Sequence, residues 1–309
     1  HVRETSGLSE DVIDELWAEL RPVIEGEEIY ALETPPEVER LYPDEPHIKS
    51  MCLHLCHDCN LRCRYCFAST GDYHTGHREM LPLETGKRAI DFLIETSGPR
   101  KHLDIDFFGG EPLLNWPVVV DLVHYAEQRG EETNKDLRLT ITTNAYLLNE
   151  ERSHFLNDHF KNIVLSFDGR PEVQNHMRPA AGGQDTYERT LRNIQEFVKI
   201  RGDREYYVRG TYTRENLDFD KDVLHIRDQG IEQISMEPMV GDPADPFTLR
   251  AEDLDEIKES YARLAKAYVD DRKQGKPSFA FFHFNIDIDG GPCLYKRYKG
   301  CGSGTEYIA

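Results

Sequence analysis

The chain has 309 residues, 39% hydrophobic and 30% charged, which is enough for a globular protein with a large core. It has no apolar run long enough to cross a bilayer and no signal-peptide pattern, so we expect no membrane partner. The net charge of −20 also disfavours nucleic acid, because phosphate binding needs concentrated Lys and Arg. The chain begins at His1 and stops within an apparently structured segment, so we expect a fragment.

The N-terminal part differs in composition from the rest. A helix is predicted from Leu8 to about Ile24, and a short extended piece follows at 28–32. Prolines then interrupt any regular element before residue 47 (Pro35, Pro36, Pro43 and Pro46). We therefore expect a small N-terminal domain over residues 1–34 and a linker over 35–46.

Strands and helices alternate from residue 47 to about 275. The strand-like runs begin near Ile48, Leu103, Leu137, Ile163, Tyr206 and Gln233. The helical patterns lie near 84–97, 117–131, 149–159, 186–201, 219–229 and 252–274. Six successive strand–helix units predict an α/β fold with a parallel sheet, and they suit an open, partial (β/α)6 TIM-like barrel. The active site of such a barrel lies at the carboxyl ends of its strands.

Five of the seven cysteines fall between Cys52 and Cys66. Clustered thiols in a long chain without a signal peptide indicate a metal site in a reducing compartment, so we expect the cytoplasm. Two overlapping segments have the spacing C-x3-C-x2-C. The first is Cys52, Cys56 and Cys59, and the second is Cys59, Cys63 and Cys66.

Strand geometry favours the second set. Cys52 continues the first strand, and a strand rises about 3.3 Å per residue, so Cys52 and Cys56 would lie about 13 Å apart. Cys59, Cys63 and Cys66 instead begin in a polar loop that can curl around a ligand. We expect Cys52 and Cys56 to be packing thiols, as free cysteines are commonly buried.

Three thiolates leave one iron of a four-iron cluster without a protein ligand, and that open iron can bind a substrate or cofactor. Zinc is the alternative, since C-x2-C pairs also form zinc knuckles. Zinc motifs usually repeat the pair or add His, however, and the barrel context is wrong for them. The spacing therefore favours a [4Fe-4S] cluster.

The run from Cys59 to Phe67 resembles the signature of radical S-adenosylmethionine (SAM) enzymes, including an aromatic residue, Tyr65, before the third cysteine. The resemblance implies that SAM binds the open iron through its amino and carboxylate groups. It also implies that an electron from the reduced cluster cleaves SAM to a 5′-deoxyadenosyl radical, which abstracts a substrate hydrogen. Cys59, Cys63 and Cys66 are thus the expected catalytic ligands, and Tyr65 is expected in the cofactor site.

Further motifs follow later strands. Gly109, Gly110 and Glu111 form an ordinary turn by themselves, but after the cysteine loop they resemble the motif that binds the SAM amino group. Ser166 matches a ribose contact of related enzymes, and Arg178 matches a partner of the SAM carboxylate.

Two more polar residues end strands. Asn144, after the third strand, is a further candidate for the cofactor site, and Glu237, after the sixth, is an interior acid of unknown role. Strand-end capping or surface pairing is the alternative for Asn144, as it is for Ser166 and Arg178. Ser166 and Asp168 share strand parity, so both can point into the barrel.

The last segment, 276–309, is aromatic, then glycine-rich, with cysteines at Cys293 and Cys301. After a radical SAM barrel it resembles a bridging region and the opening of a SPASM domain, which carries one or two auxiliary [4Fe-4S] clusters. The resemblance then implies that Cys301 and Cys293 are ligands of an auxiliary cluster, and that these two cysteines are only part of its full ligand set. Two cysteines alone can also be inert or form a disulfide.

Phrases such as Tyr207–Arg214 and Gly300–Tyr307 resemble the maturases of six-cysteine (SCIFF-type) ribosomal peptides, or ranthipeptides. The resemblance runs from about residue 48 to the end. It implies that a hydrogen is removed from an acceptor residue such as Thr, and that a Cys thiol of a cysteine-rich precursor peptide is joined there as a thioether. An auxiliary cluster can bind that thiolate or take up the surplus electron.

The same resemblance implies two further features. One is a leader-binding winged helix, of which residues 1–34 would be the tail, and the other is a flavodoxin- or ferredoxin-type one-electron reductant. Three alternatives remain. They are another SPASM-type maturase such as a formylglycine-forming enzyme, a non-enzymatic iron–sulfur electron carrier, and a zinc-dependent binding module.

Overall fold

The computed structural model describes residues 9–25, 46–275, 279–285 and 302–309. The chain forms two compact units, one made of 1–46 with 294–300 and the other of 47–293 with 301–309. In the first unit the described element is helix α2 (Glu10–Glu25), which confirms the predicted N-terminal helix. The extended piece expected at 28–32 and nearly all of the expected linker lie outside the described residues.

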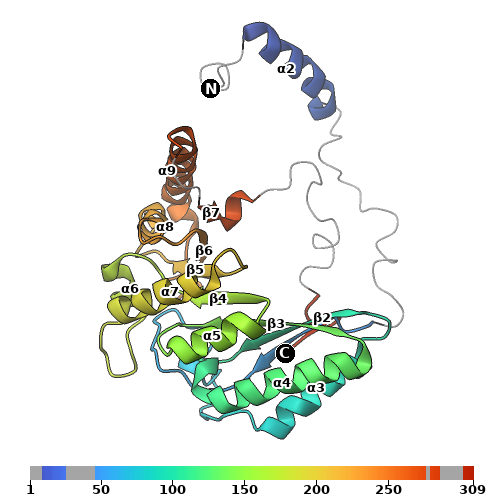
Figure 1. The fold of residues 1–309 in the computed structure, drawn as a ribbon. Helices are drawn as coiled ribbons and strands as arrows, with labels where there is room; N and C mark the ends of the chain where they lie inside the picture. The colour runs from blue at the N-terminus through green and yellow to red at the C-terminus, as the bar shows by residue number, and fades with distance from the viewer. Residues whose placement is uncertain (1–8, 26–45, 276–278, 286–301) are drawn as a thin grey trace. The chain divides into compact units, whose positions relative to one another are not determined.

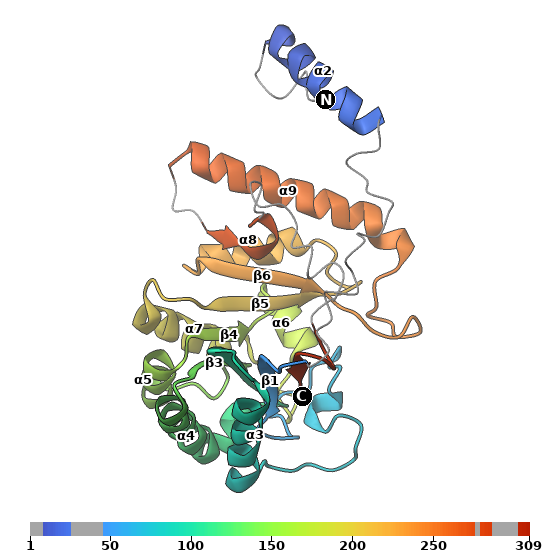
Figure 2. The ribbon, with the colours of Figure 1, turned by 90° about the vertical axis from the view of Figure 1, so that its right-hand side faces the viewer.

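The second unit is built on one curved sheet, whose strands follow the order β7-β6-β5-β4-β3-β2-β1-β8 (Figures 1 and 2). Every neighbouring pair is parallel. The strands are β1 (Ser50–His54), β2 (His102–Phe108), β3 (Asp136–Thr143), β4 (Asn162–Ser166), β5 (Tyr207–Tyr212), β6 (Gln233–Pro238), β7 (Ala280–Phe281) and β8 (Tyr307–Ile308).

Helices connect consecutive strands along the outer side of the sheet (Figure 2). They are α3 (Leu83–Thr96), α4 (Trp116–Thr133), α5 (Glu150–His159), α6 (Pro171–Met177), α7 (Tyr187–Arg201), α8 (Phe219–Asp228) and α9 (Leu254–Lys273). The parallel α/β sheet and its six strand–helix units are as predicted. Short 3-10 turns lie at Ser69–Gly71, Pro112–Asn115, Ala251–Asp253 and Phe282–Phe284.

The two faces of the sheet differ in polarity. In β2, Leu103, Ile105 and Phe107 are completely buried and belong to the apolar core under the helices. The alternate residues Asp104 and Asp106 are only partly buried, because strand side chains alternate between faces. The inner side of the barrel therefore carries polar groups that can face a bound ligand.

The sheet is open, because β7 and β8 are its two edge strands and do not pair with each other. Both edges are two-residue strands outside the six predicted units. Among the described residues, the sheet therefore does not close into a complete barrel. Within the described ranges, no helix has the length and apolar character needed to cross a membrane.

Candidate active site

A cavity of about 530 Å³ lies at the carboxyl ends of strands β1 to β6. Its lining includes ten of the residues singled out in the sequence: Cys59, Cys63, Tyr65, Cys66, Gly109, Gly110, Asn144, Ser166, Arg178 and Glu237. Glu111 lies buried beside the cavity, and Cys293 and Cys301 fall outside the described residues. Motifs that are more than 170 residues apart in sequence therefore share one site.

The cysteine loop is held in place by backbone hydrogen bonds to the segment after α6. Arg62 N donates to the carbonyl of Pro179 at 2.8 Å, and Arg64 N donates to that of Met177 at 2.9 Å. Ala181 N donates in turn to the carbonyl of Asn60 at 2.8 Å. This antiparallel pairing fixes the loop conformation through the protein's own contacts.

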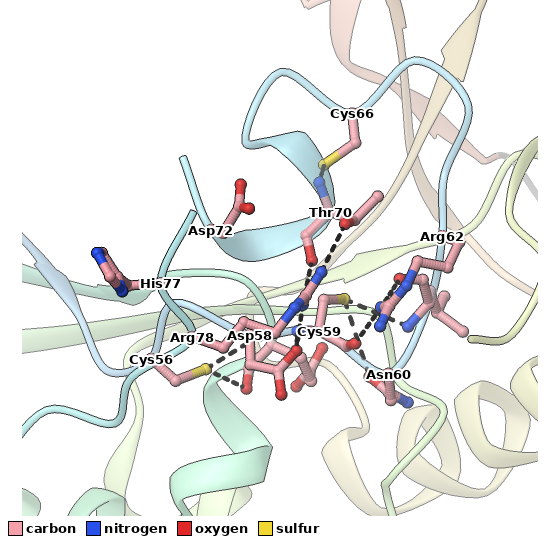
Figure 3. A network of polar contacts seen from close by, with 12 residues as sticks. Cys56, Asp58, Cys59, Asn60, Arg62, Cys66, Thr70, Asp72, His77 and Arg78 are labelled. Carbon is pink, nitrogen blue, oxygen red and sulfur yellow. Dashed lines mark hydrogen bonds and ion pairs between the residues drawn. The ribbon is translucent and has the colours of Figure 1, made fainter. Parts of the chain in front are cut away.

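Backbone N–H groups point at two of the loop sulfurs. The Cys59 sulfur accepts from Leu61 N at 3.4 Å, and the Cys66 sulfur accepts from Thr70 N at 3.3 Å (Figure 3). Such donors stabilise negative charge on a sulfur. All five cysteines between Cys52 and Cys66 are free thiols.

Burial makes two of these thiols weak acids. It raises the pKa of Cys59 to about 12, with the Glu111 carboxylate adding to the effect, and it raises the pKa of Cys63 to about 11. Because only a thiolate binds a metal, ligation must release the protons of both groups.

The spacing of the thiols can be compared with that of a zinc site. A tetrahedral zinc ion with bonds of 2.3 Å holds its sulfurs about 3.8 Å apart. Within the described part of the chain, the three ligand atoms that approach within 4.8 Å of one another belong to His124, Glu127 and His159, not to the cysteine loop. The three cysteine thiols therefore do not stand at zinc spacing in this conformation of the described loop.

Cys52 and Cys56, the alternative ligands, lie apart from the cavity lining. The Cys56 side chain is 1% exposed, and its thiol donates to the carbonyl of Glu111 at 2.9 Å. Cys56 therefore packs between the first two βα loops, as expected.

Gly109 and Gly110 bring backbone close to the cysteine loop. Gly109 has a φ of +128°, and a Cβ there would lie 2.5 Å from the Cys56 carbonyl oxygen. A Cβ on Gly110 would lie only 2.0 Å from the carbonyl oxygen of Asp58. Only glycine fits this contact, which leaves the Gly109 and Gly110 backbone exposed to the cavity.

Glu111 lies behind these glycines and organises the end of β3. Its carboxylate accepts hydrogen bonds from the Thr143 hydroxyl and the Asn144 backbone N–H, each at 2.7 Å, and from Leu113 N at 3.0 Å. Burial raises its pKa, while the bond from Asn144 opposes that shift. Asn144 Nδ2 in turn donates to Asn60 at 2.8 Å, so Glu111 indirectly supports the cysteine loop.

Arg178, Tyr65 and Asp168 form a network between the cysteine loop and the region that follows β4. Arg178 Nη1 donates to the Tyr65 hydroxyl at 2.7 Å, and that hydroxyl donates to Asp168 Oδ2 at 2.6 Å. Arg178 also lies 3.6 Å from Asp168 Oδ1. Its Nε is buried without a hydrogen-bond partner, and the Arg178 side chain lines the cavity, where its charge can attract an anionic group such as a carboxylate.

Glu237 lies at the end of β6, across the cavity from the cysteines. Ser235 donates to its carboxylate at 2.6 Å, and His283 Nε2 lies 3.3 Å from both oxygens. The other ring nitrogen of His283 is 2.8 Å from the Tyr261 hydroxyl. These contacts, the one to His283 foremost, lower the pKa of Glu237 to about 2, so it is ionised at neutral pH.

Sequence reasoning missed two of these residues, Tyr261 and His283, because no pattern links them to Glu237. Strand parity predicts that Asp168 can point into the barrel, but it does not predict the contacts of Asp168 with Tyr65 and Arg178. The aromatic run after residue 276 was the one available signal for His283. Arg209 and Thr211 on β5 also line the cavity without having been singled out.

The sequence family follows from the segment that carries this site. A model of the radical SAM superfamily matches residues 53–218, more than half of the chain. The chain belongs to the radical SAM superfamily. Its members are enzymes, and the match spans the cysteine loop, both glycines and Arg178.

Curated relatives of this radical SAM protein modify different substrates. The radical SAM cyclopropyl synthase TigE of Paramaledivibacter caminithermalis is 24% identical over 200 residues, which are 60% of this chain and 40% of that protein. A cysteine-type anaerobic sulfatase-maturating enzyme of Clostridium perfringens is 27% identical over 150 residues, 46% of this chain and 39% of that one. The chain thus spans less than half of the length of these relatives.

Solved structures share the fold. Native anSMEcpe with bound AdoMet matches with a TM-score of 0.65 at 19% identity, over 77% of this chain and 64% of that chain. SuiB of Streptococcus suis matches with a TM-score of 0.53 at 16% identity, over 82% of this chain and 53% of that chain. The partial barrel found here is therefore a radical SAM fold.

The residues present fit the cofactors of this superfamily, a [4Fe-4S] cluster and SAM. The free thiols of Cys59, Cys63 and Cys66 would hold the cluster. Gly109, Gly110 and the positively charged Arg178 side chain line the same cavity and would stand near the charged end of SAM. The cavity volume also lies in the ordinary range of small-molecule sites.

Proposed function

We propose that this radical SAM protein cleaves SAM and forms a Cys-to-residue thioether cross-link in a ribosomally made precursor peptide. The observation that carries the proposal is the single cavity that joins three free loop cysteines to a polar end at Glu237. When bound, the cluster and SAM supply a 5′-deoxyadenosyl radical that removes a substrate hydrogen atom. The chain's own residues hold and shield that chemistry.

Each residue has a distinct part in this proposal. Cys59, Cys63 and Cys66 would ligate the cluster, while Arg178 and the Gly109–Gly110 backbone would orient SAM. Asn144 and Ser166 would contact SAM from the ends of β3 and β4. Burial of Arg178 keeps water from its charge, which strengthens its electrostatic interactions.

The peptide substrate is supported by the exposed apolar rim of the cavity. Phe67 and Val240 line it and are 69% and 84% exposed, so both present apolar surface to solvent. A solved structure of anSMEcpe with bound AdoMet also holds a peptide. We infer that a peptide segment approaches over this rim toward Glu237.

The remaining parts of the proposal concern the two ends of the chain, much of which lies outside the described ranges, and the electron donor. Cys293 and Cys301 would begin an auxiliary-cluster set in a SPASM domain from residue 276, and residues 1–34 would be the tail of a leader-binding domain, joined by the linker 35–46 to the barrel of 47–275. An external one-electron reductant of the flavodoxin or ferredoxin type would reduce the cluster. The resemblance to six-cysteine peptide maturases supports these assignments.

The first test is SAM cleavage under anaerobic conditions. The chain is reconstituted with iron and sulfide, reduced and mixed with SAM, and 5′-deoxyadenosine is measured by chromatography. We expect product from the wild type and from C52A, and none from C59A, C63A or C66A. If the iron-loaded wild type makes no 5′-deoxyadenosine, even with candidate peptides present, the proposal that this chain cleaves SAM is wrong. The iron–sulfur electron carrier then becomes the preferred function.

The second test separates the two maturase functions. A thioether removes two hydrogens from the precursor peptide and retains its sulfur, whereas formylglycine formation from Cys removes the sulfur. Mass spectrometry of a cysteine-rich precursor therefore distinguishes them. Loss of sulfur, or no change in a peptide that binds the enzyme, would contradict the thioether assignment.

A further inference from the structure

A cluster of metal-ligating side chains lies away from the cavity, on helices α4 and α5. His124, Glu127 and His159 each offer a ligand atom, and these atoms lie within 4.8 Å of one another. None of the three residues lines the candidate active site. The helices that carry them are neighbours on the outer side of the sheet in both views (Figures 1 and 2).

The backbone brings these side chains together. His124 and Glu127 are three residues apart on α4, so they share one helix face, and His124 Nδ1 lies 3.5 Å from Glu127 Oε2. His159 is the last residue of α5, and its Nδ1 lies 2.7 Å from Glu127 Oε1. One carboxylate therefore stands between two imidazole rings from different helices.

Aromatic packing orients both imidazoles. The ring of Phe155, one turn before His159 on α5, lies 4.3 Å from the His159 ring and 5.7 Å from the His124 ring. The two imidazoles themselves are 5.3 Å apart and nearly perpendicular, at 87°. Rings held in this way have less rotational freedom to lose when they bind an ion.

The donor set indicates which ion fits. Two imidazole nitrogens and one carboxylate suit a borderline divalent ion, and this set with a water in the fourth position is a known zinc arrangement. Bonds of 2.0–2.1 Å would place the ligand atoms about 3.3 Å apart, so side-chain rotations must close the present spacing by about 1.5 Å or less. Room for the water exists, because the side chains of His124 and Glu127 are 56% and 47% exposed.

We propose that His124, Glu127 and His159 form an exchangeable binding site for a zinc-class divalent cation that bridges α4 and α5. The ion replaces the direct contacts of Glu127 with the two imidazoles. It clamps the helices on either side of β3, the strand whose end carries Thr143 and Asn144 in the cavity. This site is independent of the iron–sulfur chemistry and of the proposed peptide substrate.

The test titrates Zn²⁺ alone into the full chain by calorimetry. Because cysteines also bind zinc, the titration uses the cluster-reconstituted chain and, separately, a C59A/C63A/C66A background. H124A, E127Q and H159A are compared in both with H154A, an exposed histidine of the same α5 helix outside the triad. Loss of a ligand should weaken binding of one equivalent of Zn²⁺ at least tenfold, whereas H154A should bind as wild type does.

Spectroscopy gives a second readout that does not depend on stability. The zinc X-ray absorption spectrum of the C59A/C63A/C66A chain should show a zinc site with only nitrogen and oxygen ligands near 2.0 Å. The spectrum should lose this signal when H159A is added. Zinc should also raise the melting temperature of the wild type and H154A more than that of the three ligand variants. If the ligand variants bind Zn²⁺ with the same stoichiometry and affinity as H154A, the proposal is overturned.

Discussion

Arg178 and Asp168 are opposite charges enclosed almost completely by protein, with 8% and 0% of their surfaces exposed. An unpaired buried charge costs several kcal/mol, so the Tyr65 hydroxyl and the Asp168 carboxylate stabilise the guanidinium in the absence of a ligand. Burial raises the pKa of Asp168, but the charge of Arg178 and the hydrogen bond from Tyr65 oppose that change. The network therefore orients Arg178, whose side chain lines the cavity.

This network predicts the behaviour of D168N. The amide has nearly the same shape but removes the negative charge, so the orientation of Arg178 and Tyr65 should relax. We expect SAM to bind at least tenfold more weakly, with iron content unchanged, because the loop thiols are intact. Equilibrium dialysis with SAM and the electron paramagnetic resonance change of the reduced cluster on SAM addition measure this effect.

D104N is the matched control, since Asp104 also pairs with an arginine, Arg138, at 2.8 Å on neighbouring strands. That pair is about 40% exposed and lies outside the cavity lining. We expect its loss to leave SAM affinity unchanged. Equal SAM affinities for D168N and wild type would show that Asp168 has no positioning role.

The lowered pKa of Glu237 predicts that the free energy of unfolding depends on pH. Its folded-state pKa of about 2 lies below the ordinary value of 4.5, so the hydrogen bonds to the ionised carboxylate stabilise the fold above pH 4.5. That stabilisation is lost as the pH falls from 4.5 toward 2. Because the carboxylate is partly solvent-exposed, we expect it to contribute about 1 kcal/mol. Urea unfolding of the cluster-free chain at pH 7 and pH 3 measures it.

E237Q provides the comparison for that measurement. It should lower the free energy of unfolding at pH 7 and should lose less stability than the wild type between pH 7 and pH 3. E252Q, which alters a carboxylate that is 66% exposed, should follow the wild type. Identical pH profiles for E237Q and the wild type would contradict the role of this carboxylate.

At residue level, the sequence located the cavity but not the contacts within it. Spacing, position after strands and the resemblance to radical SAM enzymes identified ten of the lining residues, and parallel strands bring their carboxyl ends to one edge. Strand parity could not separate Ser166 from Asp168, since β4 ends at Ser166 and the following backbone no longer alternates. Ser166 lines the cavity, whereas Asp168 lies fully buried next to Tyr65.

Among the elements, the cysteine loop gains its shape from two other segments. The run from Met177 to Ala181 pairs with it on one side, and the Gly109–Glu111 turn binds its beginning on the other, where Gly110 N donates to the Cys56 carbonyl at 2.9 Å. Arg78 adds an ion pair to Asp58 (Figure 3). The loop can therefore adopt its ligating conformation before a cluster is assembled.

This close approach predicts that G110A impairs cluster assembly. An added Cβ would lie 2.0 Å from a backbone carbonyl oxygen, which no side-chain rotation can relieve, so the loop must move. We expect a loss of about 2 kcal/mol in stability, within the range for overpacked sites. Iron and sulfide bound per chain after reconstitution should fall to less than half of the wild-type value.

G183A separates this clash from ordinary backbone strain. Gly183 has a φ of +81° but open space around its Cβ position. G183A should therefore lose some stability and still assemble the cluster. If G110A retains iron and sulfide as well as G183A does, the close approach is not required for assembly.

The regular elements could be predicted because they are long and strongly patterned. The predicted helices near 84–97 and 186–201 lie within one residue of α3 and α7, whose apolar residues recur at helical spacing. The short elements could not be predicted in this way. Helix α6 has only seven residues, and β7 and β8 have two each. These segments are too short to show the repeating apolar pattern of a helix or a strand. Tertiary contacts, not local pattern, determine them.

The whole barrel is open because its edge strands, β7 and β8, do not meet. β8 continues the sheet beyond β1, although it is the last described strand in the chain. The residues just before it, Gly302–Glu306, thus return to the start of the barrel.

Glu306 holds this returning segment to the barrel. Its carboxylate is almost fully buried and lies 2.9 Å from Arg100 Nη2 and 3.4 Å from Lys49 Nζ. Its backbone carbonyl also accepts from Lys49 N at 2.8 Å. A two-residue strand gains little from its own ladder, so we expect E306A to lower the free energy of unfolding by about 2 kcal/mol, measured by urea denaturation.

E252A is the control, because Glu252 forms an exposed ion pair with Arg214 and should change stability by less than about 1 kcal/mol. Limited proteolysis gives an independent readout, since a detached β8 should be cleaved near Gly302–Gly304 while the rest of the barrel stays intact. E306A should show this cleavage and E252A should not. Equal stability and equal proteolysis of the two variants would mean that the Glu306 carboxylate is not needed to hold β8 in the sheet. The backbone hydrogen bonds between β8 and β1 would then be sufficient.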